Sequence, residues 1–287
     1  MPYIPGATLG GRRVDLGSIS LGMTDAAGVA WHLREIEGWS GSEVRAEYSA
    51  READHGAWNS PVYLSQRPIT LSGLIEAPNL NALDTAVEQL LAACAVTDTT
   101  LVVYETTPKQ AVVRRSGKPL VRHLTDRVAE YSLLVTAGDP RRYSTTLQSQ
   151  STALPSTTGG LSVPLSVPLT ISTTTVAGSI TLVNEGTFAT RPVFTLTGPV
   201  TNPTITVQYP GGAVKALLYS SSIDTGDDLV IDTDTHSVVL NDAVSRRLYL
   251  SGQWPEIPPG TAVEVGWYAD TYNAAALLTG TCRSAWI

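Results

Sequence analysis

Short stretches of the first half of the chain alternate apolar and polar side chains, which is the period of a β-strand with one buried face. Residues 44–49 follow this pattern and are predicted to form a half-buried strand. Residues 67–77 and 129–135 follow it too, and each is predicted to bury one face. Gly73 interrupts the apolar face of the second stretch, which indicates a β-bulge or a close approach of another backbone.

A helical period occurs between the second and third of these strands. Its apolar side chains recur at spacings of three and four residues, at Leu80, Leu83, Val87, Leu90, Leu91 and Cys94. This stripe predicts an amphipathic helix that packs on a sheet. Pro78 precedes it, and Asn81 with Asp84 resembles a capping arrangement. Strands before and after a single helix predict an α+β domain at residues 1–145.

The composition changes after Thr145. Residues 146–169 are rich in Ser, Thr and Pro and are predicted to form a linker or an extended arm. Residues 170–287 contain many short apolar stretches separated by turn-forming residues, and no helical stripe. Regular short strands of this kind predict a β-sandwich. The predicted fold class is therefore mainly β with one helix.

Composition and charge narrow the possible functions. The 287 residues carry a formal net charge of −7, whereas general nucleic-acid binders have a basic surplus. The N-terminus lacks the apolar segment of a secretory signal, and no apolar run approaches the ~20 residues of a membrane span. We therefore expect synthesis in a cytoplasm and no membrane insertion. The two cysteines, Cys94 and Cys282, are far apart and are interpreted as buried free thiols.

Motifs for catalysis or cofactor binding do not stand out. The sequence has no GxSxG elbow and no phosphate-binding loop, and none of its four histidines has another at metal-ligand spacing. Asp232 and Asp234 have a spacing that suggests calcium, but the remaining ligands of that motif are missing, so an acidic hairpin turn is the favoured interpretation. We predict no enzyme activity, no metal and no cofactor.

One tryptophan has two possible roles. Trp254 lies in the loop "SGQWPEIPPG", where an exposed ring could stack on a sugar. The other interpretation, which we favour, is packing of the ring against Pro255 or against a partner chain.

The segment "AGDPRRYS" ends the strand at residues 129–135 and has three possible roles: a phosphate contact, a catalytic ion pair or a structural joint. An aspartate followed by proline ends a strand in a turn. The two arginines have too few basic neighbours for a phosphate site and can pair with carboxylates instead. We interpret the segment as a joint between the two domains, formed by Asp139, Pro140, Arg141, Arg142 and Tyr143.

The order of several segments gives a family resemblance. "IEGWSGSEVRAEYSAREADHGAW", then "RPITLSGLIEAP" before a helix, then a strand ending in "AGDPRRY", resembles the N-terminal domain of siphophage distal tail proteins, also described as minor tail proteins. "LVNEGTFATRPVFTLTGPVTNPTITV", "GDDLVIDTDTHSVVLND" and "CRSAWI" resemble the C-terminal domain of actinobacteriophage members.

The resemblance implies a split-barrel-like N-terminal domain that forms a six-membered ring around the tail channel, and a galectin-like sandwich that points outward. Such a ring is a hub of the virion that joins the tail tube to the tail tip. Its implied partners are copies of itself, the major tail tube protein, and the tail-tip and tape-measure-end proteins. The alternative hypothesis is a carbohydrate-binding module that uses Trp254. The second half is too short for the carbohydrate-binding insertions of many hubs in this family.

Overall fold

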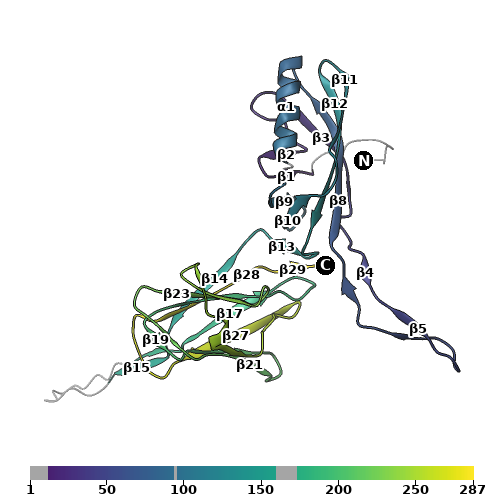
Figure 1. Cartoon of the computed structure of the whole chain (residues 1–287). Coiled ribbons are helices and arrows are strands. Elements are labelled where there is room, and N and C mark those ends of the chain that lie inside the picture. Colours follow the sequence, from purple (N-terminus) through teal and green to yellow (C-terminus); the bar gives the residue numbers. More distant parts are fainter. Residues whose placement is uncertain (1–11, 94–95, 160–172) are drawn as a thin grey trace. The chain divides into compact units, whose positions relative to one another are not determined.

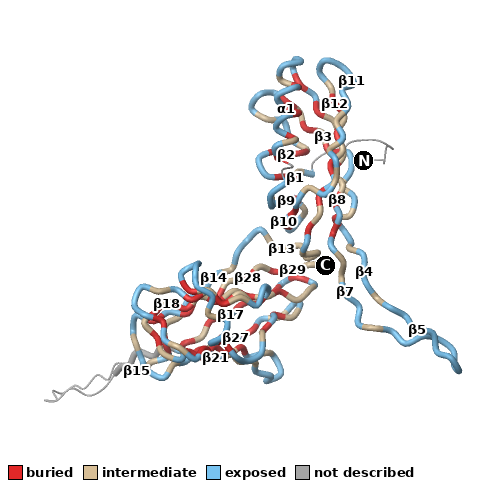
Figure 2. The backbone as a smooth tube through the Cα atoms, in the orientation of Figure 1, coloured by how far each residue is buried: buried red, intermediate tan, exposed pale blue. Residues whose placement is uncertain are grey.

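A computed structural model of the chain describes residues 12–93, 96–159 and 173–287. The chain divides into two compact units, Met1–Thr145 with Ile287, and Thr146–Trp286. Each unit has a hydrophobic core of its own. Burial alternates along the strands of both units, because successive side chains of a strand point to opposite faces (Figure 2).

One antiparallel sheet forms the framework of the first unit (Figure 1). Its strands lie in the order β2 (Ile19–Leu21), β1 (Val14–Leu16), β9 (Thr99–Val103), β10 (Lys109–Arg115), β12 (Val128–Ala137), β8 (Arg67–Glu76) and β3 (Ala30–Glu37). Two further strands extend it: β11 (Leu120–Thr125) pairs with β12, and β13 (Arg142–Ser144) pairs with β10. The predicted helix is α1 (Leu80–Ala93), which packs against β2 and β8.

The start of α1 differs from the prediction in its cap. The side-chain oxygen of Asn79, rather than that of Asn81, accepts a hydrogen bond from the Ala82 backbone N–H at 3.0 Å. Asn79 satisfies a donor that the first turn of a helix cannot pair internally. Leu83, Val87 and Leu90 of the predicted apolar stripe are buried, whereas Leu80 at its start is exposed.

The expectation of a close approach at Gly73 is confirmed. A Cβ on Gly73 would lie 1.9 Å from the carbonyl oxygen of His32, on the neighbouring strand β3. The pairing of β3 with β8 shifts by one residue between Leu33 and Glu35, next to this point. The hydroxyl of Tyr131 donates to the same His32 carbonyl at 3.1 Å. The glycine therefore leaves room for both the bulge and the buried tyrosine.

The predicted half-buried strand at residues 44–49 is wrong. These residues belong to an arm, which we define as residues 40–66, in which every residue of the four short strands is exposed or at most half-buried. The strands pair as β4 (Val44–Arg45) with β7 (Tyr63–Leu64), and β5 (Tyr48–Ala50) with β6 (Ala57–Asn59). The alternation in the sequence predicts an extended conformation, which the arm has, but no second layer from the described part of the chain covers either face (Figure 2).

The second unit consists mainly of two antiparallel sheets around one core. The first has the order β14 (Gln148–Ala153), β28 (Leu277–Cys282), β18 (Val193–Thr197), β23 (Asp228–Asp232), β24 (Ser237–Leu240) and β25 (Val244–Ser245). The second has the order β17 (Ser179–Asn184), β27 (Thr261–Tyr268), β20 (Thr204–Gln208), β21 (Val214–Tyr219) and β26 (Leu250–Gly252). The smaller elements are β15 (Ser156–Gly159) paired with β16 (Thr173–Val176), β19 (Val200–Thr201) paired with β22 (Ser222–Ile223), the 3₁₀ turn η1 (Arg247–Tyr249), and β29 (Ala285–Trp286).

Part of the expected linker is a strand instead. Residues 148–153 form β14 and pair along their whole length with β28. The side-chain amide of Gln148 donates to the Val183 carbonyl at 2.6 Å and accepts from the Val183 N–H at 3.1 Å. The side chain of Gln148, on the edge strand β14 of one sheet, thus bonds to the backbone of β17, the edge strand of the other sheet, where no backbone pairing joins the two strands. The proline-rich part of the expected linker, residues 161–169, lies outside the described residues.

Candidate functional site: the exit turn and the arm

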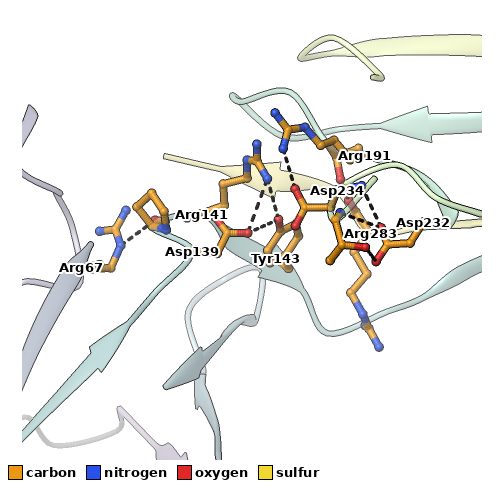
Figure 3. A network of polar contacts seen from close by, with 11 residues as sticks. Arg67, Asp139, Arg141, Tyr143, Arg191, Asp232, Asp234 and Arg283 are labelled. Atoms are coloured by element: carbon orange, nitrogen blue, oxygen red, sulfur yellow. Dashed lines mark hydrogen bonds and ion pairs between the residues drawn. The ribbon is translucent and has the colours of Figure 1, made fainter. Parts of the chain in front are cut away.

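The segment singled out in the sequence forms a turn closed by its own aspartate (Figure 3). We call residues 138–143, which run from the end of β12 into the first two residues of β13, the exit turn. The carboxylate of Asp139 accepts from the Arg141 backbone N–H at 3.1 Å and from the Tyr143 hydroxyl at 2.5 Å. Burial, and then the nearby Asp139 carboxylate, raise the pKa of Tyr143. The tyrosine therefore stays protonated and continues to donate.

A buried arginine outside the turn holds the exit turn in place. Arg67 opens β8 and has no exposed surface. Its Nε donates to the Pro140 carbonyl at 2.8 Å, while its Nη1 donates to the carbonyls of Trp39 at 2.7 Å and Gly38 at 3.3 Å. Burial, together with the positive charge of Arg142, lowers the pKa of Arg67 to about 10. Its remaining nitrogen, Nη2, is buried without a hydrogen-bond acceptor.

Trp39 connects the same region to the hairpin of β9 and β10. Its buried indole N–H donates to the Glu105 carboxylate at 2.8 Å, and Lys109 contacts the other oxygen of that carboxylate at 2.6 Å. Burial by itself would raise the pKa of Glu105, but its contacts with Lys109 and Trp39 outweigh burial and lower it. The guanidinium of Arg142 lies 5.5 Å from the centre of the Trp39 ring.

The arm begins directly after this tryptophan. Gly38 has φ of +79°, and a Cβ there would lie 2.0 Å from the Pro68 carbonyl oxygen. Only glycine therefore fits at position 38. We define Gly38 and Trp39 as the arm root. Beyond the root the arm carries exposed apolar side chains, and those of Trp58 and Tyr63 are 67% and 62% exposed. Figure 1 shows the arm projecting beyond the sheet of the first unit.

The five residues predicted as a joint therefore fall into two groups. Asp139, Arg141 and Tyr143 bond to one another, and Pro140 offers its carbonyl to Arg67. Arg142 faces the Trp39 ring instead and is half-buried. Whether the five residues act as a joint between the two units stays a proposal.

Trp254 is not a bare platform on the second unit. Its ring is half-buried and packs against the core of that unit. The ring of His236 stacks on it with centroids 4.6 Å apart, and the guanidinium of Arg247 lies 5.0 Å from its centre. These contacts pack the ring within the chain, and a sugar would compete with them for the ring. Packing against Pro255 or against a partner chain, favoured from the sequence, stays a prediction.

The other candidate residues have structural roles. Cys282 is a buried free thiol, as predicted, and burial raises its pKa to about 11, whereas Cys94 lies outside the described residues. Asp232 accepts from the backbone N–H of Asp234 at 2.8 Å, which closes the predicted hairpin turn between β23 and β24. Within residues 12–93, 96–159 and 173–287, no group of three or more potential ligands could hold a metal ion. No helix in the same residues is long and apolar enough to span a membrane.

Sequence reasoning missed Arg67 and the arm. The signal for Arg67 was present, because it occupies the same face of its strand as Ile69 and Leu71, which is the buried face. A charged side chain at such a position needs buried acceptors. The arm had no comparable signal, because exposed and half-buried strands share the same alternation.

Comparison with known proteins identifies the domain in the second unit. Residues 185–275 match the family model "Siphovirus-type tail component, C-terminal domain". The second unit therefore carries this domain. No curated protein is similar enough in sequence to match the chain.

Two solved structures share the fold over most of the chain. The Dit protein of phage SPP1, described as a paradigm of the hub adsorption apparatus in phages that infect Gram-positive bacteria, matches with a TM-score of 0.61 and 13% identity, over 89% of this chain and 93% of its own. A chain from the phage P2 baseplate in its activated, calcium-bound conformation matches with a TM-score of 0.50 and 10% identity, over 91% of this chain and 99% of its own. Domain and fold both agree with the resemblance to siphophage distal tail proteins.

Proposed function

We propose that this chain is a structural protein of a long non-contractile phage tail, located in the virion, and that copies of it form a ring hub at the distal end of the tail. One observation carries the proposal: a tail-component domain at residues 185–275 lies within a fold shared with the SPP1 hub over 89% of the chain. By analogy with that hub, the ring joins the major tail tube protein to the tail-tip and tape-measure-end proteins. In this role the chain needs no catalytic group.

The arm supports a ring. A two-stranded hairpin is marginally stable by itself, and this one exposes apolar side chains to water. These side chains are Val44, Tyr48, Trp58, Val62 and Tyr63. We infer that a second copy of the chain covers them. The arm of one copy then contacts a different surface of the next copy, and head-to-tail contacts of this kind close into rings.

Removal of the exposed aromatics of the arm tests this contact. We expect the wild-type protein to form six-membered assemblies of 30.4 kDa chains, which is about 180 kDa, in mass photometry. The double variant Trp58→Ser/Tyr63→Ser should stay at the mass of one chain. Its circular dichroism spectrum should not change, because surface substitutions shift the stability of a single chain by only about 0.5 kcal/mol.

Tyr272→Ser is the matched control, since this tyrosine of the second unit is also exposed (58%) but lies outside the arm. It should assemble like the wild type. The ring proposal fails if the wild-type protein remains a monomer at high concentration and in the presence of the tube and tip proteins. The role of the arm fails if the double variant assembles normally.

A further inference from the structure

Arg67 bonds to two segments that are far apart in the sequence. Through Nε it holds Pro140, 73 residues ahead, and through Nη1 it holds the carbonyls of the arm root, Gly38 and Trp39, 29 and 28 residues behind. The first segment begins the exit turn, and the second begins the arm. Both contacts lie inside the first unit.

The shape of the side chain makes these contacts interdependent. A guanidinium is planar and rigid, so the directions of its Nε–H and Nη–H bonds are fixed relative to each other. A shift of Pro140 that keeps its hydrogen bond must rotate or displace the whole plane. The donors to Gly38 and Trp39 then move with it.

The surroundings of Arg67 show that it does not merely fill the core. Among the residues that the structure describes, its hydrogen-bond acceptors are backbone carbonyls, Nη2 has no acceptor, and the side chain is buried. Aliphatic residues such as Ile69 and Leu71 occupy the same face at lower cost, because a buried charge loses its hydration. The arm root has two further contacts, from the Trp39 indole to Glu105 and from Arg142 to the Trp39 ring, but Arg67 is the residue that hydrogen-bonds to the backbone of both segments.

We propose that Arg67 is a positioning residue that couples the arm root to the exit turn, so that a change at either segment is transmitted to the other. This inference goes beyond the ring proposal and concerns a single chain, so it holds or fails independently of assembly. In a ring, it would link the direction in which the arm reaches its neighbour to the segment through which the chain leaves the first unit.

Hydrogen–deuterium exchange tests the coupling in the Trp58→Ser/Tyr63→Ser protein, which we expect to stay monomeric and into which each change below is introduced. Asp139→Asn weakens the contacts that close the exit turn but leaves Arg67 in place. We expect faster exchange, by several-fold, in peptides of the exit turn and also in peptides of the arm root. In Arg67→Met the arm root should already exchange faster, and addition of Asp139→Asn should have a clearly smaller effect there than in the Arg67-containing protein, because, of the contacts described above, only that of Arg142 with the Trp39 ring still joins the two segments.

Asp98→Asn is the control, because this exposed aspartate pairs with Arg114 in the same unit but does not contact Arg67. It should leave the arm root unchanged. The coupling is wrong if, in the protein that contains Arg67, Asp139→Asn accelerates exchange in the exit turn but not in the arm root. This comparison does not depend on the Arg67→Met variant. It is also wrong if Asp139→Asn has an equal effect on the arm root in the wild-type and Arg67→Met backgrounds, since independent sites act additively. Mass photometry of each sample verifies the monomeric state.

Discussion

At the scale of single residues, the exit turn depends on one short contact. The hydroxyl of Tyr143 donates to the Asp139 carboxylate at 2.5 Å, and a hydrogen bond to a charged group contributes more than one between neutral groups. We expect Tyr143→Phe to lower the free energy of unfolding of the first unit by about 1–2 kcal/mol at neutral pH. Chemical denaturation monitored separately for the two units measures this loss, and an unchanged transition would contradict it.

The same tyrosine has a predictable pH dependence. Its pKa is raised in the folded chain, so the unfolded chain loses the phenol proton first. The stabilisation by this contact is therefore complete below about pH 10, the ordinary tyrosine pKa, and is lost as the pH rises through the higher folded value. Between pH 9 and 11 the wild-type unit should lose more stability than Tyr143→Phe. Equal losses in both proteins would show that the contact does not titrate in this way.

Trp254 provides a second residue-scale prediction. Because its ring packs on the core and under His236, we expect Trp254→Ala to destabilise the second unit by about 1–3 kcal/mol, below the cost of a fully buried tryptophan. Thermal unfolding measures this, with Trp254→Phe as the variant that retains an aromatic ring. Unchanged stability combined with loss of binding on a glycan array would instead support the carbohydrate hypothesis.

Some of these contacts could be predicted from the identity of single residues, whereas others could not, for a physical reason. Gly73 was predictable, since glycine within a strand indicates that a side chain has no room. The roles of Asp139 and Pro140 in ending β12 were also local properties. The position of Arg67 on the buried face of β8 indicated a buried charge, but its partners could not be identified, because they lie 28 to 73 residues away and their carbonyls carry no sequence signature.

At the scale of elements, β14 shows how a polar segment can be a strand. Gln148 pairs both its amide N–H and its carbonyl with the backbone of Val183, on the edge of the other sheet. Gln148→Leu has a similar volume but leaves both backbone groups of Val183 without these partners, so we expect a loss of about 1–3 kcal/mol and faster amide exchange at Val183 in β17. Ser149→Ala, at the exposed neighbouring position, should have no comparable effect. Equal exchange in the two variants would refute this role.

The elements that the sequence predicted are those with strong periodicity. The helix α1 and the long strands β8 and β12 each carry an apolar face over several turns or alternations, and each buries that face. The arm and β14 were misassigned because their environment is set by other segments. The strands of the arm alternate apolar and polar residues, but both of their faces are exposed. Hydrogen bonds rather than buried apolar side chains hold β14 in place.

At the scale of the whole molecule, the chain consists of two units with different architectures. The first combines a long sheet, one helix and an exposed arm, and the second is built from two sheets around a core of its own. Order and composition predicted this plan, because a run of strands around one helix and a run of short strands leave few architectures available. The surfaces that act in an assembly were not predictable, since they are defined by side chains that no part of the same chain covers.

We propose that the chain forms a hub at the distal end of a phage tail. Electron microscopy of particles that carry this protein, labelled with a gold-conjugated antibody against its second unit, shows where the chain lies in the virion. We expect label at the tail tip only, below the last ring of the tail tube. Label along the tube, on the capsid, or absent from assembled particles would show that the chain is not a hub of the tail tip.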